Sequence, residues 1–421
     1  MIKLNGQVTD QTNFFEGHDP FALAEAYGTP LYVYNERILR ERCRDLHDLV
    51  QYPHFRVNYS MKANSNLAFL QVVRDENIDV DVMSPGEIHT ALAAGFRPEQ
   101  IFYIANNVSR EEMQFAIDRG IKTSVDSLSQ LERYGQLNPG GKVAIRFNPG
   151  VGAGHHEKVV TGGKKTKFGV NIEYLPRVKE ILAQYNLNLI GINQHIGSLF
   201  MDGDSYVQGV ESLLSVAREF PALEFIDIGG GFGIPYKKQD GQARLDLQAL
   251  GERLDARINA FVAEYGREIT FKCEPGRYLS AECGLLLGTV HTTKFNGDQK
   301  YIGTDVGFNV LIRPAMYDSH HDIEVYRKTD NGLANNTEEV IVVGNICESG
   351  DILANHRGLP AIQEDDLIGV LDAGAYGFAM ASNYNNRLRP AEIFIRCDGT
   401  IALTRKRDEL EDLTKNFIPM L

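Results

Sequence analysis

Strand-like segments alternate with helical segments from residue 57 to residue 275, and this alternation limits the possible folds more than any other feature. Each strand-like segment is a short apolar run, alternating with polar residues or continuous, that ends at turn residues. There are eight such runs, at 57–62, 78–84, 101–106, 122–127, 142–148, 189–197, 224–230 and 270–275. Eight strands in roughly 230 residues match a TIM-like (β/α)8 barrel. A doubly wound open sheet is the alternative, and it would fit fewer strands.

The pattern changes after the last of these runs, which predicts a second domain. With 421 residues the chain is longer than most single domains. Helical periodicity stops near Glu282. Strand-like runs follow, at 284–292, 300–305, 338–344, 367–372 and 391–396. We predict a barrel at 35–284 and a C-terminal β-sandwich or β-barrel domain at 285–421, which ends in a short polar helix near 407–415. An N-terminal arm, residues 1–34, should join the β domain.

Charge and composition exclude several classes of partner. The formal net charge of −13 argues against nucleic acid or an anionic membrane surface. No apolar run approaches the ~20 residues of a membrane span, and the N-terminal segment has no signal-peptide core. The five cysteines are an odd number without metal-type spacing, which favours reduced thiols over disulfides. We expect a cytoplasmic enzyme that binds neither nucleic acid nor membrane.

Lys62 ends the first strand of the predicted barrel. In (β/α)8 barrels the chemistry is carried at the C-terminal ends of the strands. A lysine held there and partly desolvated has a lowered pKa, and it can form an imine with a carbonyl such as the aldehyde of pyridoxal phosphate (PLP). The alternative is an ordinary surface lysine. Only the rest of the chain can decide between the two.

Three further features end strands at the same predicted rim. Glycines 229–231 have unhindered N–H groups that could cradle a phosphate, although Ile234 stands where a dinucleotide-binding motif needs glycine and a plain turn is the alternative. Glu274 and Arg277 end the last strand, where a simple ion pair is the other interpretation. His195 ends another strand and could equally be structural.

Together these residues meet the needs of a PLP enzyme. Such an enzyme uses a lysine for the imine, an anion cradle for the phosphate and an acidic group at the pyridine nitrogen. Lys62, the glycines 229–231 and Glu274 can fill these roles, and His195 could stack on the ring face.

Seven motifs in the chain resemble those of the fold-type III PLP decarboxylases of basic amino acids, which are relatives of alanine racemase and ornithine decarboxylase. Among them the resemblance is closest to the diaminopimelate decarboxylase family. The motifs span almost the whole chain in family order. They are YSMKAN (59–64), HIGS (195–198), GGGFG (229–233), EPGR (274–277), GFNVLIRPAMY (307–317), CESGD (347–351) and GAYG (374–377).

The resemblance implies a set of cofactor contacts. Lys62 would be the Schiff-base lysine, His195 would pack against the ring, and Glu274 would lie at the pyridinium. The implied phosphate contacts are Ser198, Gly230, Gly231, Gly276, Arg277 and Tyr376.

The resemblance also implies how the substrate is held. Arg277, Arg313 and Tyr317 match the positions that hold the carboxylate at its far end, a charge that suits a guanidinium. Glu348 matches the position that meets the distal ammonium, and Tyr376 is a further contact.

Cys347 would be the general acid that returns a proton to the α-carbon after CO2 leaves. In this family the residues matching Cys347, Glu348 and Tyr376 come from the β domain and complete the site of a neighbouring subunit. An obligate homodimer with shared active sites is therefore implied, and the monomer should be inactive.

The distal half of the site implies the substrate. A lysine or ornithine decarboxylase needs only an acidic group there, whereas diaminopimelate ends in both an ammonium and a carboxylate. Arg313 would pair with the distal carboxylate and Glu348 with the distal ammonium. Leaving either charge buried without a partner costs several kcal/mol. The implied reaction converts meso-2,6-diaminopimelate to L-lysine and CO2, the last step of lysine biosynthesis.

Other functions remain open at this point. A sibling decarboxylase could act on D-lysine, D-ornithine, carboxynorspermidine or a carrier-bound glutamyl group. A PLP racemase would want a second catalytic base, usually tyrosine, and has no use for the CESGD motif. A non-catalytic homologue would tend to lose the lysine or the cysteine, and this chain has both Lys62 and Cys347.

The glycine-rich stretch 149–167 is long and basic, so we expect an active-site lid rather than a linker. It contains His155, His156 and Glu157, which could be read as metal ligands. Adjacent ligands in such a loop lack supporting groups, and we interpret them, like His320 and His321, as loop polar groups. No metal is expected.

Overall fold

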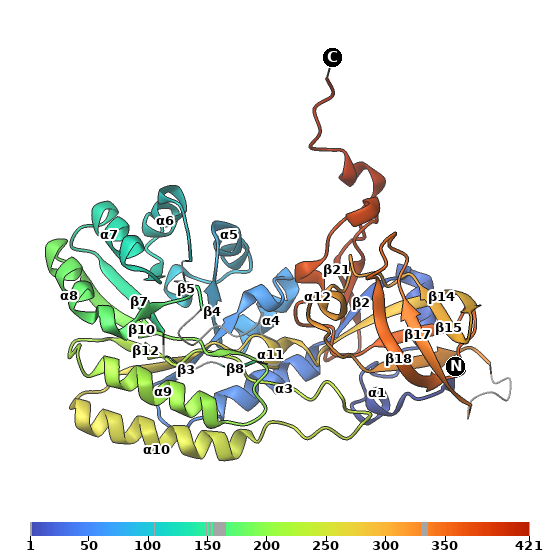
Figure 1. Ribbon diagram of the computed structural model, residues 1–421, viewed down its shortest axis with the longest axis horizontal. Helices are drawn as coiled ribbons and strands as arrows, with labels where there is room; N and C mark the ends of the chain where they lie inside the picture. The colour runs from blue at the N-terminus through green and yellow to red at the C-terminus, as the bar shows by residue number, and fades with distance from the viewer. Residues whose placement is uncertain are drawn as a thin grey trace. The chain divides into compact units, whose positions relative to one another are not determined.

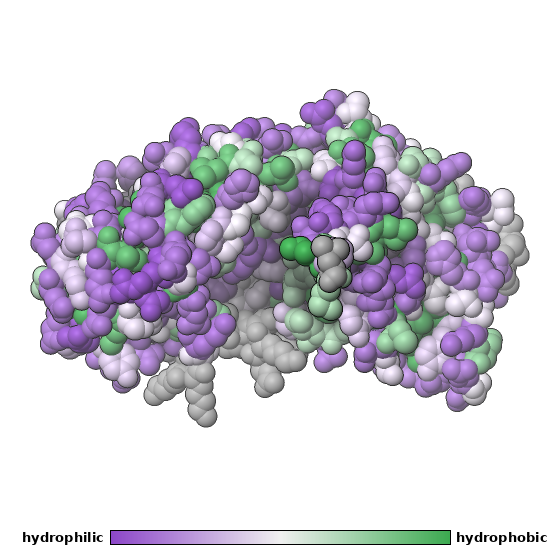
Figure 2. All heavy atoms as spheres, turned by 90° about the horizontal axis from the view of Figure 1, so that it is seen from above, coloured by the Kyte–Doolittle hydropathy of each residue, from purple (hydrophilic) through white to green (hydrophobic). Residues whose placement is uncertain are grey.

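The computed structural model describes residues 2–104, 106–148, 150, 153–154, 166–329 and 336–420. The chain divides into two compact units. The barrel unit comprises residues 40–234 and 244–279, and the β unit comprises residues 1–39, 235–243 and 280–421. Hydrophilic residues dominate the face drawn in Figure 2. None of the helices built from the described residues has the length and apolar character needed to cross a membrane.

Eight parallel strands close into a barrel (Figure 1). Their order is β10-β12-β13-β3-β4-β5-β6-β7, and β7 pairs with β10 to complete the ring. The strands are β3 (Phe55–Ser60), β4 (Asp79–Val82), β5 (Ile101–Ile104), β6 (Lys122–Val125), β7 (Lys142–Asn148), β10 (Asn188–Asn193), β12 (Phe225–Asp227) and β13 (Thr270–Cys273). Short β9 (Val170–Asn171) extends the sheet beside β7, and β8 (Ala153–Gly154) pairs with β11 (Gly197–Ser198). The closed ring confirms the predicted barrel and rules out the open sheet.

A helix precedes the first barrel strand, and helices follow the barrel strands, as the sequence pattern predicts. They are α3 (Glu36–His47), α4 (Leu67–Asp75), α5 (Pro85–Ala93), α6 (Arg110–Ile117), α7 (Leu128–Leu137), α8 (Leu175–Gln184), α9 (Asp204–Ala217), α10 (Leu247–Tyr265) and α11 (Arg277–Ser280), with 3-10 turns η1 (Met61–Ala63), η2 (Pro98–Gln100) and η4 (Ile172–Tyr174). Side-chain caps fix several starts: Asn66, Ser84, Ser109 and Ser127 each accept a hydrogen bond from the first turn.

The β unit is built on a ten-stranded sheet. Its main path runs β1-β16-β19-β14-β15-β17-β18, while β2 pairs with β14 and β20, and β21 pairs with β20. The strands are β1 (Ile2–Lys3), β2 (Leu31–Asn35), β14 (Gly284–Asn296), β15 (Gln299–Thr304), β16 (Ile323–Arg327), β17 (Thr337–Val343), β18 (Ile352–Pro360), β19 (Leu367–Val370), β20 (Ala391–Ile395) and β21 (Ile401–Arg405). The N-terminal segment thus supplies two strands to this sheet, as expected.

Helical turns of the β unit are short. They are α1 (Gln7–Gln11), α2 (Pro20–Tyr27), α12 (Arg313–Tyr317), η5 (Phe378–Met380), η6 (Tyr384–Asn386) and η7 (Leu410–Leu413). The predicted polar helix at 407–415 is therefore wrong in type, because only one exposed 3-10 turn forms there. No apolar face stabilises that turn, and short helices without tertiary packing are marginal.

The sequence pattern missed four strands of the β unit: β1, β16, β18 and β21. In β16 all five residues are buried although two of them are charged. Glu324 accepts hydrogen bonds from the Thr9 backbone and hydroxyl, and Arg327 pairs with Asp366. The two charged residues interrupt the apolar pattern of the strand. Because their partners lie far away in the sequence, the sequence does not show that these charges are buried.

The segment 235–243 leaves the barrel sequence between β12 and α10 and belongs to the β unit. Lys238 lies half-buried between two carboxylates of that unit, with its Nζ 2.5 Å from Asp372 and 3.1 Å from Glu282. The N–H of Gln239 donates to Asp322 at 2.9 Å. These charge-assisted bonds hold the segment, and no composition shift in the sequence announces it.

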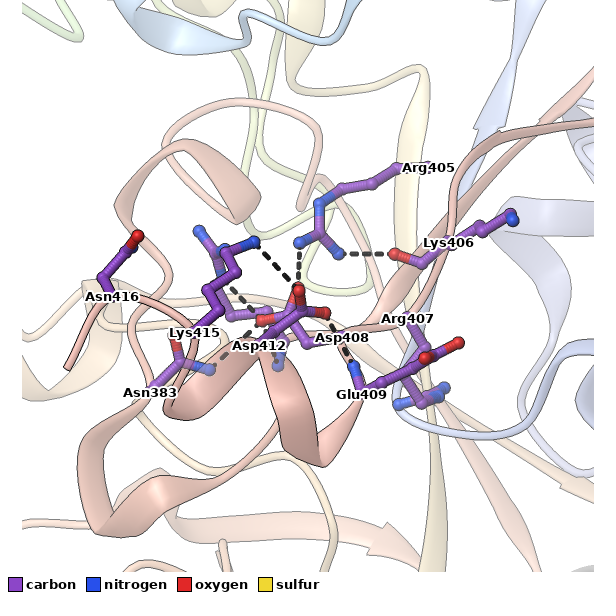
Figure 3. A pocket seen from close by; sticks show the side chains of 10 residues that line it. Asn383, Arg405, Lys406, Arg407, Asp408, Glu409, Asp412, Lys415 and Asn416 are labelled. Carbon is purple, nitrogen blue, oxygen red and sulfur yellow. Dashed lines mark hydrogen bonds and ion pairs between the residues drawn. The ribbon is translucent and has the colours of Figure 1, made fainter. Parts of the chain in front are cut away.

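Asp408 anchors the C-terminal segment in a polar surface pocket (Figure 3). Its carboxylate accepts from Arg389 Nε at 2.8 Å, from Asn383 Nδ2 at 3.2 Å and from Arg405. Burial alone would raise the pKa of Asp408, but these hydrogen bonds outweigh it and hold the pKa well below its usual range. The ionised carboxylate therefore stabilises the folded chain.

We predict that Asp408→Asn lowers the free energy of unfolding at pH 7 by about 1–3 kcal/mol, because it removes a charge partner of two arginines. A depressed pKa in the folded state means that this stabilisation is present above the unfolded pKa of about 3.9 and is lost as the pH falls further. Denaturant unfolding at pH 7 and at pH 3 measures the difference. Glu411→Gln, an exposed acid nearby, is the control, and an equal loss in both variants would contradict the assignment.

Candidate active site

Lys62 lies in the single turn η1, directly after β3. Ser60, the last residue of the strand, donates its N–H to the Pro275 carbonyl at 3.1 Å and its hydroxyl to the Glu274 carbonyl at 3.2 Å. The two strand ends that carry the predicted lysine and the predicted acid are therefore tied together. Lys62 itself is exposed, which corrects the expectation of partial desolvation. The turn carries its side chain beyond the packed strand, while its neighbours Met61 and Ala63 are buried.

Two acidic residues near Lys62 were missed by the sequence reasoning. Burial raises the pKa of Asp81 on β4 and that of Glu87 on α5, and in both cases the positive charge of Lys62 opposes the rise. The ammonium therefore lies in the field of both carboxyl groups. The available signal was the charge of Asp81 at an alternating position inside a predicted strand.

His195 is neutral and has a defined tautomer. Its Nδ1 accepts the N–H of Gly230 at 3.2 Å, so the ring proton is on Nε2. Burial lowers the pKa of His195 well below its usual value, and the nearby cations Lys62 and Arg146 lower it further. A neutral ring is suited to stacking against a flat partner without adding a charge.

Close backbone packing requires glycine in the segment 229–231. A Cβ on Gly230 would lie 1.9 Å from the Glu274 carbonyl oxygen, and one on Gly231 would lie 2.5 Å from the Gly197 carbonyl oxygen. Gly229 and Gly231 also have positive φ angles, of 78° and 112°. The expectation of unhindered N–H groups needs correction, because Gly229 donates to the Asp227 carboxylate at 2.9 Å and Gly230 donates to His195.

Glu274 is a buried carboxyl group at the end of β13, with 5% of its surface exposed. Burial raises its pKa well above the usual range, the neighbouring carboxylates Asp227 and Asp81 raise it further, and the Arg146 guanidinium opposes them. Its Oε1 has no hydrogen-bond partner among the described residues. A buried oxygen of this kind fits a ligand that supplies an N–H, such as a protonated ring nitrogen.

Arg277 and Ser198 form a polar pair from two predicted motifs. Arg277 begins α11, and its Nη2 and Nε donate to the Ser198 hydroxyl at 3.0 and 3.3 Å. The arginine is 5% exposed. A guanidinium, a hydroxyl and the preceding Gly276 are the kinds of group that bind a phosphate. The predicted cofactor residues of the barrel unit therefore occupy the ends of neighbouring strands.

In the β unit, α12 places Arg313 and Tyr317 four residues apart, and hence on one helix face. Arg313 is 1% exposed. Its Nη1 lies 2.6 Å from His321 Nε2, and its Nη2 donates to the Ser319 hydroxyl at 3.3 Å. The ring of Tyr236 lies against the guanidinium, with its centroid 4.6 Å from Cζ. Tyr317 is half-buried.

Cys347 and Glu348 are exposed on a short loop of the β unit. Asp351, the last residue of the CESGD motif, is buried and accepts the N–H groups of Ile346 at 2.7 Å and Phe308 at 2.6 Å. The N–H of Cys347 donates to Asn385 Oδ1 at 2.7 Å. The loop therefore presents its thiol and carboxylate on a fixed backbone.

Tyr376 lies in the tight turn formed by the GAYG motif and has a positive φ of 56°. A Cβ on Gly374 would lie 1.9 Å from the Ser280 carbonyl oxygen, and one on Gly377 would lie 2.4 Å from the Ala373 carbonyl oxygen. Both glycines are therefore needed for the turn to pack. The turn fixes the backbone at a tyrosine that is only partly buried.

The remaining predictions concern the glycine-rich stretch, the histidines and the cysteines. Most of the predicted lid 149–167, including His155, His156 and Glu157, lies outside the described residues. His320 Nε2 bonds Asp322 at 2.9 Å, and the described part of the chain contains no cluster of His, Cys, Asp or Glu that could hold a metal ion. None of the five cysteines, all of which the structure describes, takes part in a disulfide.

A (β/α)8 barrel with a lysine, a buried carboxyl group, a glycine segment and an arginine-serine pair at its strand ends defines the class of PLP-dependent barrel enzymes. Comparison with known proteins agrees, because residues 36–281 match the family model of the pyridoxal binding domain of pyridoxal-dependent decarboxylases.

Similarity to individual proteins extends over nearly the whole chain. The chain is 42% identical over 408 residues to the diaminopimelate decarboxylase of Methanothermobacter thermautotrophicus, covering 95% of this chain and 94% of that protein. The corresponding protein of Escherichia coli is 34% identical, covering 93% and 94%. The crystal structure of the M. jannaschii diaminopimelate decarboxylase in co-complex with L-lysine is similar with a TM-score of 0.85, at 30% identity and 96% and 95% coverage. The chain belongs to the diaminopimelate decarboxylase family.

Proposed function

We propose that the protein catalyses the PLP-dependent decarboxylation of meso-2,6-diaminopimelate to L-lysine and CO2, the last step of lysine biosynthesis. The observation that carries the proposal is the similarity to diaminopimelate decarboxylases over 95% of the chain. The residues of both units support it, because they supply one group for each chemical need of this reaction.

The residues of the barrel unit suit PLP. Bound PLP withdraws electrons from the α-carbon, so that a bond from that carbon to a carboxylate can break. Lys62 would bind the cofactor covalently through Nζ, and Oε1 of Glu274, which has no hydrogen-bond partner among the described residues, fits its ring nitrogen. Neutral His195 would pack against the ring. The phosphate would be held by Ser198, Gly230, Gly231, Gly276 and Arg277, with Tyr376 as a further contact.

The residues of the β unit suit the far end of the substrate. Arg313, together with Tyr317 and Arg277, binds the distal carboxylate, and Glu348 binds the distal ammonium; Tyr376 is a further substrate contact. A guanidinium binds a carboxylate through two parallel hydrogen bonds, which fixes orientation as well as charge. A substrate that lacks the carboxylate cannot form these hydrogen bonds with the buried Arg313 guanidinium, and this loss gives the selectivity.

Cys347 acts as the general acid that protonates the α-carbon after CO2 departs. We also propose that the protein is a homodimer in which Cys347, Glu348 and Tyr376 complete the site of the other subunit. The exposure of Cys347 and Glu348 in a single chain supports this role, since both are accessible to another molecule. A cytoplasmic location stays a prediction from the sequence.

A mixing experiment tests the shared sites. Lys62→Ala and Cys347→Ala dimers should each have a strongly reduced activity. A mixture after subunit exchange should regain part of the wild-type activity, because one of the two sites in each mixed dimer has both groups. Activity is assayed before and after exchange, which is verified by mass spectrometry of the intact dimers. No recovery after verified exchange would mean that each chain builds its own site.

Turnover of a set of substrates tests the proposed reaction against its siblings. We expect the purified, PLP-loaded protein to release CO2 from meso-diaminopimelate and not from L-lysine, D-lysine, D-ornithine or carboxynorspermidine. If only a monocarboxylate is turned over, the assigned fold and cofactor still hold, but Arg313 does not determine the substrate specificity.

A further inference from the structure

Arg313 differs in its partners from Arg327, another buried arginine of the β unit. Arg327 is 5% exposed, and its Nε and Nη2 donate to the Asp366 carboxylate at 2.8 and 2.5 Å. That carboxylate neutralises the guanidinium. Arg313 instead donates to an imidazole nitrogen of His321 and to the Ser319 hydroxyl. These two contacts orient the guanidinium, and neither of them neutralises its charge.

The hydrogen bonds of His321 define its protonation state. Its Nδ1 lies 2.7 Å from the Leu371 carbonyl oxygen, which can only accept, so Nδ1 carries the proton. Its Nε2 lies 2.6 Å from Arg313 Nη1, and arginine can only donate, so Nε2 is the acceptor. His321 is 1% exposed and is held as one neutral tautomer. The sequence-based interpretation of this histidine as a loop polar group therefore understates its role.

Tyr236 completes the support of Arg313. Its ring faces the guanidinium at 4.6 Å and meets the His321 ring edge-on, with centroids 5.3 Å apart and an interplanar angle of 78°. Stacking on an aromatic face sets the plane of a guanidinium, and the two hydrogen bonds set its rotation within that plane. The three contacts together leave the group little freedom before any ligand arrives.

We propose that His321 is a specificity-determining positioning residue that aims the Arg313 guanidinium at the carboxylate at the far end of the substrate. A neutral acceptor suits this task, because it orients the guanidinium without adding a negative charge of its own at that place. The proposal rests on the proposed function of Arg313 and adds a residue to which the family motifs assign no role.

Two substitutions at position 321 distinguish the hydrogen bond to the Leu371 carbonyl from the hydrogen bond with Arg313. His321→Asn keeps an amide N–H in the place of Nδ1, facing the Leu371 carbonyl, and removes the acceptor for Arg313. His321→Gln reaches further and places an amide oxygen near the position of Nε2, so it keeps that acceptor. We expect His321→Asn to raise the KM for meso-diaminopimelate about tenfold or more with kcat changed less than about threefold, and His321→Gln to raise KM less than about threefold.

Calorimetric binding provides a readout that does not depend on turnover. L-lysine carries the carboxylate that Arg313 is proposed to bind, and cadaverine has the same chain without it. The Kd of L-lysine should rise about tenfold in His321→Asn while the Kd of cadaverine stays the same. His320→Asn, a neighbouring histidine that bonds Asp322, is the matched control and should change neither Kd.

Thermal melting shows whether each variant folds. If His321→Asn does not fold, Ser319→Ala takes its place, and a selective rise in the Kd of L-lysine is again expected. A folded His321→Asn with unchanged KM and Kd, or with equal losses for L-lysine and cadaverine, would overturn the proposal. A wild-type protein that neither decarboxylates meso-diaminopimelate nor binds L-lysine would overturn the proposed function itself, which is a separate outcome.

Discussion

Lys62→Ala should lose turnover by a factor on the order of 10³ or more and should also lose the visible absorbance of covalently bound PLP. The reason is that no other group would provide the amine that joins the cofactor to the protein. Absorbance spectra of the PLP-loaded variant and rates of CO2 release measure the two effects. The exposure of Lys62 at a strand end makes its amine accessible to the cofactor aldehyde.

Lys142→Ala is the matched control for this substitution. Lys142 is also an exposed lysine of the barrel, but it begins β7 and so lies at the opposite, N-terminal end of a strand. Its replacement should leave both the spectrum and the rate unchanged. An unchanged visible band in Lys62→Ala would remove this residue from its proposed role, whatever the effect on the rate.

Cys347→Ala should keep the visible band of the bound cofactor and lower turnover by a factor on the order of 10² or more, because a general acid contributes about this much. Spectra and steady-state rates again give both values. Cys397→Ala is the control, since Cys397 is the other exposed cysteine of the chain. A Cys347→Ala rate within about threefold of the wild type would contradict the assignment and would point to another proton donor.

The barrel could be predicted from the sequence because each strand carries its own apolar signal. In β10 five of the six residues are buried, and in β7 six of the seven. Continuous burial of this kind is typical of parallel strands covered by helices, and it appears in the sequence as a short apolar run. Because there are eight such runs, the closed (β/α)8 barrel was favoured over an open sheet, which would fit fewer strands.

The strand β16 shows why prediction of the β unit was less complete. Its burial depends on Glu324 and Arg327 finding partners at Thr9 and Asp366, and a single sequence does not reveal such distant pairs. The assignment of segment 235–243 to the β unit depends in the same way on Lys238 meeting Glu282 and Asp372.

The candidate site follows the same division. The strand-end positions of Lys62, His195 and Glu274 were predictable, because a barrel places the ends of its parallel strands at one rim. The protonation and hydrogen bonds of each group could not be predicted from the sequence. The proximity of Asp81 to Lys62 and the hydrogen bond from Gly230 to His195 appear only in three dimensions, and the contacts of His321 are to residues 8 and 50 positions away.

Product analysis of the wild-type, PLP-loaded protein with meso-diaminopimelate labelled in both carboxyl groups tests the central claim most directly. We expect one labelled CO2 for each L-lysine formed, with the second label retained in the lysine. Recovery of doubly labelled diaminopimelate with a changed configuration would contradict it and indicate a racemase. Unchanged substrate in the presence of bound PLP would contradict it as well and indicate a non-catalytic homologue.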